Sequence, residues 1–164
     1  MSDNEIGSWL RGRLPEDWFD GEPEVTVDRD EILVVGRLAG GAETDTTAAE
    51  GRIARFREET RERRIGIARE TERRYGRKVA WGARVGDTTV LFTRLSVPVM
   101  TRLRQPERVV LDTLVDAGVA RSRSEALAWC VRLVARHTED WLTELRQAME
   151  SVREVRERGP EESG

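Results

Sequence analysis

Three side chains at alternating positions could together contact a second molecule: Met100, Arg102 and Arg104. Residues two apart in a strand point to the same face, so the three would form a row. Arginine can donate two hydrogen bonds to O6 and N7 of guanine, a contact worth about 1–3 kcal/mol of discrimination between bases. The opposite face would be turned to a core and holds Val97, Val99, Thr101 and Leu103. The alternation predicts a strand that displays arginines to a nucleic acid, or else solvated and salt-bridged edge arginines.

A second candidate contact is the sequence Ser122-Arg123-Ser124, which opens a run without glycine or proline. Ser122 followed by Glu125 is the capping box that starts many helices. The unpaired backbone N–H groups and the dipole at a helix N-terminus favour a phosphate group. We expect these residues to hold a nucleic-acid backbone, with simple helix capping as the alternative.

The region 52–78 supplies a third candidate surface because it holds 11 basic and 5 acidic residues. Basic side chains in such a helix could neutralise phosphates along a nucleic acid. The alternative is an amphipathic helix that lies over a sheet and carries Glu–Arg pairs. The second nucleic-acid surface would consist of Arg63, Arg64, Arg73, Arg74, Arg77 and Lys78.

The elements that must position these residues fall into two sections. Residues 1–23 form an N-terminal arm or short helix that docks its aromatic residues on a small domain, residues 24–96. Alternating apolar residues and turn signals predict strands at 24–28, 31–38, 78–85 and 88–95, and a capping box at Thr47 opens a helix that bends or breaks near Gly66 and ends at Gly76. The fold class is therefore α+β, with an N-terminal ββαββ layer.

The second section spans residues 97–158 and ends in a disordered tail, residues 159–164. After the strand, a helix begins at Arg104 or Pro106 and ends at Gly118. A two-residue slip in the strand would keep the same face outward. The next helix starts at Ser122 and either continues past Thr138 or restarts there, which makes a long C-terminal helix.

This strand-helix-helix order resembles the ribbon-helix-helix family of dimeric DNA-binding proteins. The best-matched part is Leu111-Asp-Thr-Leu-Val-Asp-Ala-Gly-Val-Ala-Arg-Ser-Arg-Ser-Glu-Ala-Leu127. The resemblance implies that two chains pair their strands antiparallel, that four helices interlock, and that the ribbon enters the major groove. It assigns base contacts to Met100, Arg102 and Arg104 and phosphate contacts to Ser122, Arg123 and Ser124. The chain departs from the family pattern in carrying the motif behind 96 residues, with Pro98 in or beside the strand.

The composition argues against several other classes of protein: membrane proteins, secreted proteins, metal-binding proteins and enzymes. No apolar run is long enough to cross a bilayer, and the acidic start lacks the apolar core of a signal peptide, so we expect a cytoplasmic protein without a membrane partner. The chain has one cysteine, Cys130, and one histidine, His137, which leaves little material for a metal site. We expect no metal, no cofactor and no enzymatic activity.

The sequence therefore predicts a homodimer that binds double-stranded DNA and regulates transcription. The alternative is a non-catalytic dimeric interaction protein. In that case the strand-helix-helix section would serve only for dimerisation. The acidic arm, which belongs to a region with 4 basic and 13 acidic residues over 1–50, and the arginine-rich helix would then bind a protein or RNA partner.

Overall fold

The computed structural model describes residues 3–40 and 45–159 and divides the chain into two compact units, Met1–Val99 and Met100–Gly164. The first unit holds a four-stranded sheet with helices, and the second is helical and includes a long C-terminal helix. The predicted α+β class is thus confirmed. Among the described residues, no helix combines the length and the apolar character that crossing a bilayer requires.

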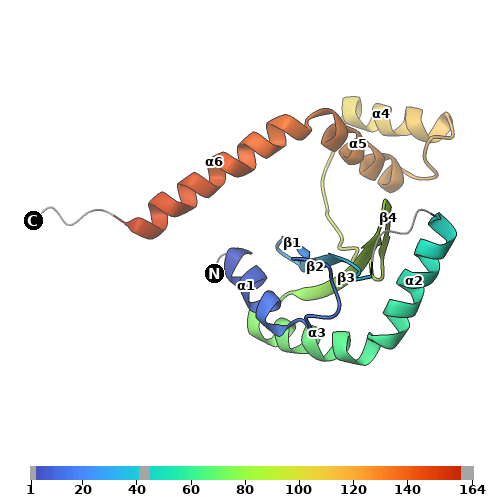
Figure 1. Cartoon of the computed structure of the whole chain (residues 1–164). Helices are drawn as coiled ribbons and strands as arrows, with labels where there is room; N and C mark the ends of the chain where they lie inside the picture. Colours follow the sequence, from blue (N-terminus) through green and yellow to red (C-terminus); the bar gives the residue numbers. More distant parts are fainter. Residues whose placement is uncertain (1–2, 41–44, 160–164) are drawn as a thin grey trace, which may run out of the picture. The chain divides into compact units, whose positions relative to one another are not determined.

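The first unit builds its sheet from two hairpins joined by a helical crossover. Its elements are α1 (Asp3–Arg13), β1 (Glu24–Val27), β2 (Glu31–Arg37), α2 (Thr46–Glu59), α3 (Arg61–Tyr75), β3 (Lys78–Val85) and β4 (Thr88–Leu91). The strand order is β1-β2-β3-β4, in which β2 and β3 are parallel and both outer pairs are antiparallel. The three helices lie on one face of the sheet (Figure 1).

The core of this unit lies between the sheet and its helices. Alternation along β2 buries Ile32 and Val34 completely, and α1 contributes the equally buried Ile6 and Leu10. Trp18 and Phe19 are also buried, so the expected docking of the N-terminal residues is confirmed. A Cβ atom at position 36 of β2 would overlap the Phe19 ring, which explains the glycine at that position.

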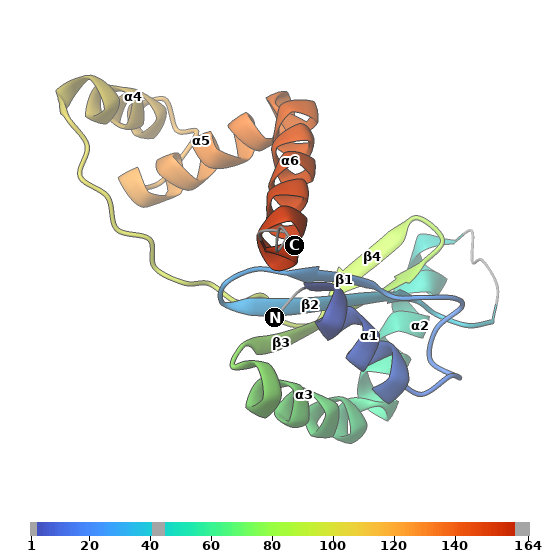
Figure 2. The ribbon, with the colours of Figure 1, turned by 90° about the vertical axis from the view of Figure 1, so that its left-hand side faces the viewer.

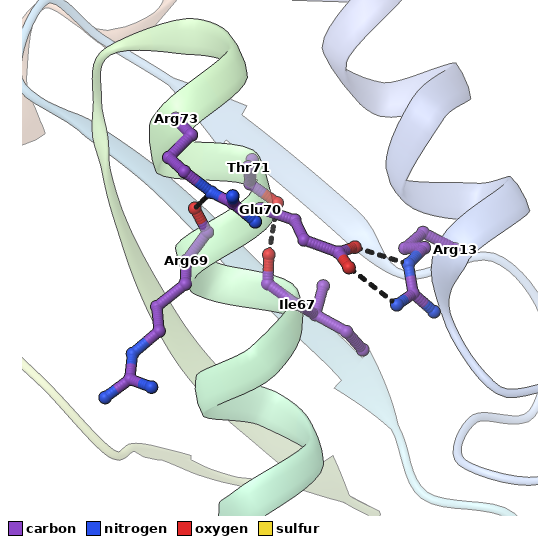
Figure 3. A network of polar contacts seen from close by, with 6 residues as sticks. All are labelled: Arg13, Ile67, Arg69, Glu70, Thr71 and Arg73. Carbon is purple, nitrogen blue, oxygen red and sulfur yellow. Dashed lines mark hydrogen bonds and ion pairs between the residues drawn. The ribbon is translucent and has the colours of Figure 1, made fainter.

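The end of α1 is fixed to α3 by an ion pair. Arg13 donates two hydrogen bonds to Glu70, from Nε at 2.6 Å and from Nη2 at 3.0 Å (Figure 3). These bonds lower the pKa of the Glu70 carboxyl and raise that of Arg13. Within α3, the Thr71 hydroxyl donates to the carbonyl of Ile67 and so satisfies its own buried oxygen. Helix α1 is therefore an integral part of the fold of the first unit.

The long basic helix breaks at Thr60, so the expected bend at Gly66 is wrong. The Thr60 hydroxyl donates to the carbonyl of Phe56, and Arg64 donates to the carbonyl of Arg57 from Nη2 at 2.6 Å. These side chains donate to backbone carbonyl groups at the end of α2, where the regular backbone hydrogen bonds of the helix stop. The unit therefore has two helices between β2 and β3 where the sequence predicted one.

Two local expectations need smaller corrections. The N-cap of α2 is Asp45, whose side chain accepts from the backbone N–H of Thr47, so the capping box expected at Thr47 does not form. Strand β4 ends at Leu91, four residues earlier than expected, although the backbone N–H of Phe92 still donates to the carbonyl of Trp81 on β3. The turns themselves are as expected, with Gly86 at φ 55° and Gly76 at φ 69°.

Residues 93–104 form neither helix nor strand in the single chain, whereas a strand was expected at 97–103. A strand is defined by hydrogen bonds to a neighbour, and no described segment of this chain pairs with these residues. Val97 and Val99, which were expected to face a core, are 45% and 84% exposed.

The second unit contains α4 (Gln105–Asp116), α5 (Arg123–His137) and α6 (Glu139–Arg158). Helices α4 and α5 form a hairpin whose turn includes Gly118 at φ 74°, and α6 restarts after Thr138 (Figure 2). Its buried core consists of Leu111, Ala120 and Ala126. Large apolar side chains stay exposed at Val109, Val110, Val119, Val131, Val134, Trp141, Leu145, Met149, Val152 and Val155.

Candidate nucleic-acid interface

In the segment that precedes α4, Leu103 faces the core of the second unit, whereas Val97, Val99 and Thr101 are exposed. Leu103 packs against the cluster around Leu111, whereas Arg102 and Arg104 on either side of it are exposed. Arg104 is extended, with φ −82° and ψ 173°. The structure thus separates Leu103 from the two arginines as the alternation predicts.

Both arginines are available to a ligand. Neither the Arg102 nor the Arg104 guanidinium makes a hydrogen bond or an ion pair with another described residue. Met100, the third member of the predicted row, is 95% exposed. An exposed thioether beside two unpaired guanidinium groups can offer apolar contact and bidentate donors to a base edge.

The start of α5 is capped as the sequence predicts. Ser122 is extended, and its hydroxyl accepts from the backbone N–H of Glu125 at 3.2 Å. The reciprocal half of the capping box is different, because the Glu125 carboxylate accepts from the backbone N–H and the guanidinium of Arg121. These bonds lower the pKa of the Glu125 carboxyl. Ser124 is exposed at the same helix end.

Arg123 is already paired within the second unit. Its guanidinium donates to both carboxylate oxygens of Asp112 on α4, at 2.7 and 2.8 Å. This pairing lowers the pKa of the Asp112 carboxyl and raises the pKa of Arg123. Arg123 is still 58% exposed, so a phosphate could approach it, but Asp112 already offsets its charge. Its phosphate contact stays a prediction.

The six basic residues expected to form a second surface are spread over different surroundings. The guanidinium groups of Arg63 and Arg74 lie over the rings of Trp18 and Tyr75, and Arg64 is buried at the junction of α2 and α3. Arg73 donates to the carbonyl of Arg69 on its own helix (Figure 3).

The rest of this set gathers at the end of α3. Arg73, Arg77 and Lys78 line a basic pocket of about 560 Å³ with Arg29 and Arg69. Within it, the Nη1 atom of Arg77 is buried without a hydrogen-bond partner. The six residues therefore do not form one continuous face.

A larger pocket, which the sequence did not predict, lies between α2, α3 and the strands β3 and β4. It has a volume of about 750 Å³, and Arg57, Arg61 and Arg64 belong to its lining. These three residues looked like ordinary members of a charged helix. On the single helix that the sequence predicts, the spacing of 57, 61 and 64 would place these residues on one face, and this spacing is the signal that could have grouped them.

Similarity to known proteins agrees with the division into two units. The family model of the N-terminal domain of Rv1265-like proteins matches residues 4–91, more than half of the chain. The chain belongs to the Rv1265-like family. A second family model, the Mb1296 C-terminal domain, matches residues 104–156. Residues 92–103 between the two matches include the whole predicted ribbon strand, residues 97–103.

Relatives from mycobacteria cover nearly the whole chain. Uncharacterized protein Mb1296 of Mycobacterium bovis and uncharacterized protein Rv1265 of Mycobacterium tuberculosis are each 61% identical to it over 156 residues. The matched residues are 93% of this chain and 69% of each relative. No solved structure matches the chain.

Proposed function

We propose that this Rv1265-like protein is a dimeric DNA-binding protein and a transcriptional regulator. Residues 97–103 of two chains would form the ribbon that reads the major groove. One observation carries the proposal: an unpaired segment with exposed arginines leads directly into a helical hairpin that has too little core of its own. The resemblance to ribbon-helix-helix proteins supports the same reading.

The small core is the argument for a second copy of the chain. Three buried apolar residues, Leu111, Ala120 and Ala126, form the centre of the second unit. Even a domain of about 60 residues normally buries about 60% of the surface of its unfolded chain, and smaller cores need oligomerisation or cross-links. The exposed valines of α4 and α5 and the unpaired strand segment would be covered together if two copies joined by C2 symmetry.

The chemistry of the ribbon face is the argument for DNA. Pairing two copies of residues 97–103 antiparallel would place two sets of Met100, Arg102 and Arg104 on one surface. A two-stranded ribbon fits the width of the major groove, and arginine is the side chain best suited to guanine there. The N-terminus of α5, with Ser122 and Ser124, would then meet the phosphate backbone.

DNA binding can be tested with a duplex selected from a random-sequence pool by the full-length protein. Fluorescence anisotropy across a range of salt concentrations then measures the affinity for that duplex. We expect Arg102→Ala and Arg104→Ala each to weaken specific binding about tenfold, as the loss of a bidentate base contact does. Arg73→Ala, which removes a basic side chain from α3, is the matched control and should change little.

The second function that the sequence left open is the other outcome of this experiment. If both ribbon variants bind the duplex as the parent protein does, the ribbon is a dimer contact only. The chain would then be an interaction protein that uses its first unit for a protein or RNA partner.

Dimerisation has its own test, which does not depend on DNA. Val99→Asp would place a charge on the core-facing side of the paired strands and should shift the mass measured by light scattering from dimer to monomer. A monomeric parent protein at micromolar concentration would overturn the proposed ribbon.

A further inference from the structure

A pocket of about 750 Å³ opens in the first unit between the α2–α3 junction and the strands β3 and β4. Its apolar wall includes Ile65 from α3, Val79 and Trp81 from β3, and Val90 and Phe92 from β4 and its end. A volume of this size is typical of sites that take small molecules, and so is a wall of aromatic and branched side chains.

Arg64 is the unusual member of this lining, because it is only 7% exposed. Its Nε donates to the Thr60 hydroxyl at 3.0 Å, and its Nη2 donates to the carbonyl of Arg57. The guanidinium carbon lies 4.8 Å from the centre of the Phe92 ring. No described carboxylate lies within ion-pair distance of Arg64. A buried charge without a counter-ion is costly, so this arrangement favours an anion.

Two further arginines add to the same positive potential. Arg57 also lies over the Phe92 ring, with its guanidinium carbon 5.7 Å from the ring centre, and makes no ion pair with a described residue. Arg61 also lines the pocket and pairs with Glu62 at 2.7 Å. Burial and the charges of these two neighbours lower the pKa of Arg64. An anion bound here would relieve both the burial cost and the repulsion.

The remaining charged residues of the lining limit the charge of the ligand. Glu50 and Glu58 from α2 contribute two carboxylates to the same pocket. They would repel a ligand with several negative charges, such as a triphosphate, but they tolerate a single charge held next to Arg64 and Arg57. We propose that this pocket binds a small organic acid, with an apolar aromatic body against Trp81 and Phe92 and one carboxylate against Arg57 and Arg64. This proposal goes beyond DNA binding and does not depend on it.

The carboxylate requirement can be tested by displacement of a fluorescent reporter from the full-length protein. The reporter, 8-anilinonaphthalene-1-sulfonate, has an aromatic body and one anionic group, and its emission rises when it leaves water. We expect 1-naphthoate to displace it at a concentration about tenfold lower than 1-naphthamide, the neutral molecule of similar shape, because hydrogen bonds to a charged group are the stronger ones. Equal displacement by the two molecules would overturn the proposal.

Variants locate the binding in this pocket. Ala68→Phe should fill it and abolish the displaceable part of the emission, whereas reporter bound to the exposed apolar side chains of the second unit should stay. Arg57→Gln should weaken 1-naphthoate about tenfold, and Arg69→Gln, on α3 but outside this pocket, should not. We avoid Arg64→Gln because that side chain also holds the helix junction. Unchanged 1-naphthoate affinity in both Ala68→Phe and Arg57→Gln would show that the site is elsewhere.

Discussion

In the proposed DNA complex, the ion pair of Arg123 with Asp112 would determine how much positive charge the start of α5 offers to DNA. Asp112 accepts two hydrogen bonds from the guanidinium, which in the proposed complex would otherwise be offered to a phosphate oxygen. In the proposed complex the carboxylate either releases Arg123 or repels the nearest phosphate. Removing the charge of Asp112 should therefore favour DNA.

We predict that Asp112→Asn strengthens DNA binding and steepens its dependence on salt. Each additional phosphate neutralised changes the slope of log affinity against log salt by about −0.9. Anisotropy titrations at several salt concentrations measure this slope. Asp116→Asn, an exposed residue on the same helix, is the control for the loss of one negative charge. Equal affinity and slope in the two variants would remove Arg123 from the DNA interface.

A second prediction at this scale concerns Asp28 in the turn between β1 and β2. Its Oδ1 accepts from the backbone N–H groups of Asp30 and Glu31 at 2.8 and 2.7 Å, and these bonds lower the pKa of its carboxyl. Because the folded pKa lies below the unfolded value of about 3.9, this stabilisation is complete above that pH and is lost as the pH falls through the folded pKa.

Thermal denaturation followed by circular dichroism from neutral to acidic pH measures this effect. The parent protein should lose more stability on acidification than Asp28→Asn, whose amide does not titrate. Asp87→Asn in the turn between β3 and β4, where the exposed side chain accepts no described hydrogen bond, should keep the profile of the parent. A parent-like profile in Asp28→Asn would contradict the assignment.

At the scale of elements, the hairpin of α4 and α5 depends on very few side chains. Leu111 is 5% exposed and is the largest of the three residues buried there. We predict that Leu111→Ala destabilises the second unit by about 2–5 kcal/mol, the usual cost of such a cavity. Hydrogen exchange should show faster opening of α4 and α5 with unchanged protection of β2 and β3. Glu107→Ala, exposed on α4, is the control, and equal protection in both variants would contradict this role of Leu111.

The sequence predicts best the elements that are set by local signals. Gly118 and Ser122 mark the end of α4 and the start of α5, and the turn at Gly86 fixes the hairpin of β3 and β4. These features depend on backbone conformation within a few residues. The sequence does not predict the break at Thr60 or the partner of Arg123, because both depend on side chains that folding brings together from a later turn or another helix.

The pocket under the α2–α3 junction was missed for the same reason. In the sequence, Arg57, Arg61 and Arg64 look like part of a charged helix. The burial of Arg64 against Phe92 becomes visible only when the helices pack on the sheet. For the ribbon face, alternation placed Leu103 inward and Arg102 and Arg104 outward. It could not say whether a second chain covers the valines.

At the scale of the whole molecule, two units with separate cores are joined by a stretch without helix or strand, residues 93–104. We predict that trypsin first cleaves the native protein after Arg94, which leaves two folded fragments. Arg102 should resist cleavage in the parent protein because the proposed ribbon pairs it with a second chain. Mass spectrometry over a time course identifies the fragments.

The variant Val99→Asp provides the comparison for this digestion. If it prevents pairing, Arg102 should become as sensitive as Arg94. Equal early cleavage at both sites in the parent protein would argue against a paired ribbon.

The joining stretch also limits how far apart the two units can act. With residues 97–103 held in the proposed ribbon, the four residues 93–96 remain as the tether and reach at most about 14 Å when fully stretched. Two binding events tethered over such a length experience each other at an effective concentration in the millimolar range. In the proposed complex, a weak affinity of the N-terminal unit for a partner on or near the DNA would then be enough to retain that partner. The short tether would convert two modest interactions into one durable attachment.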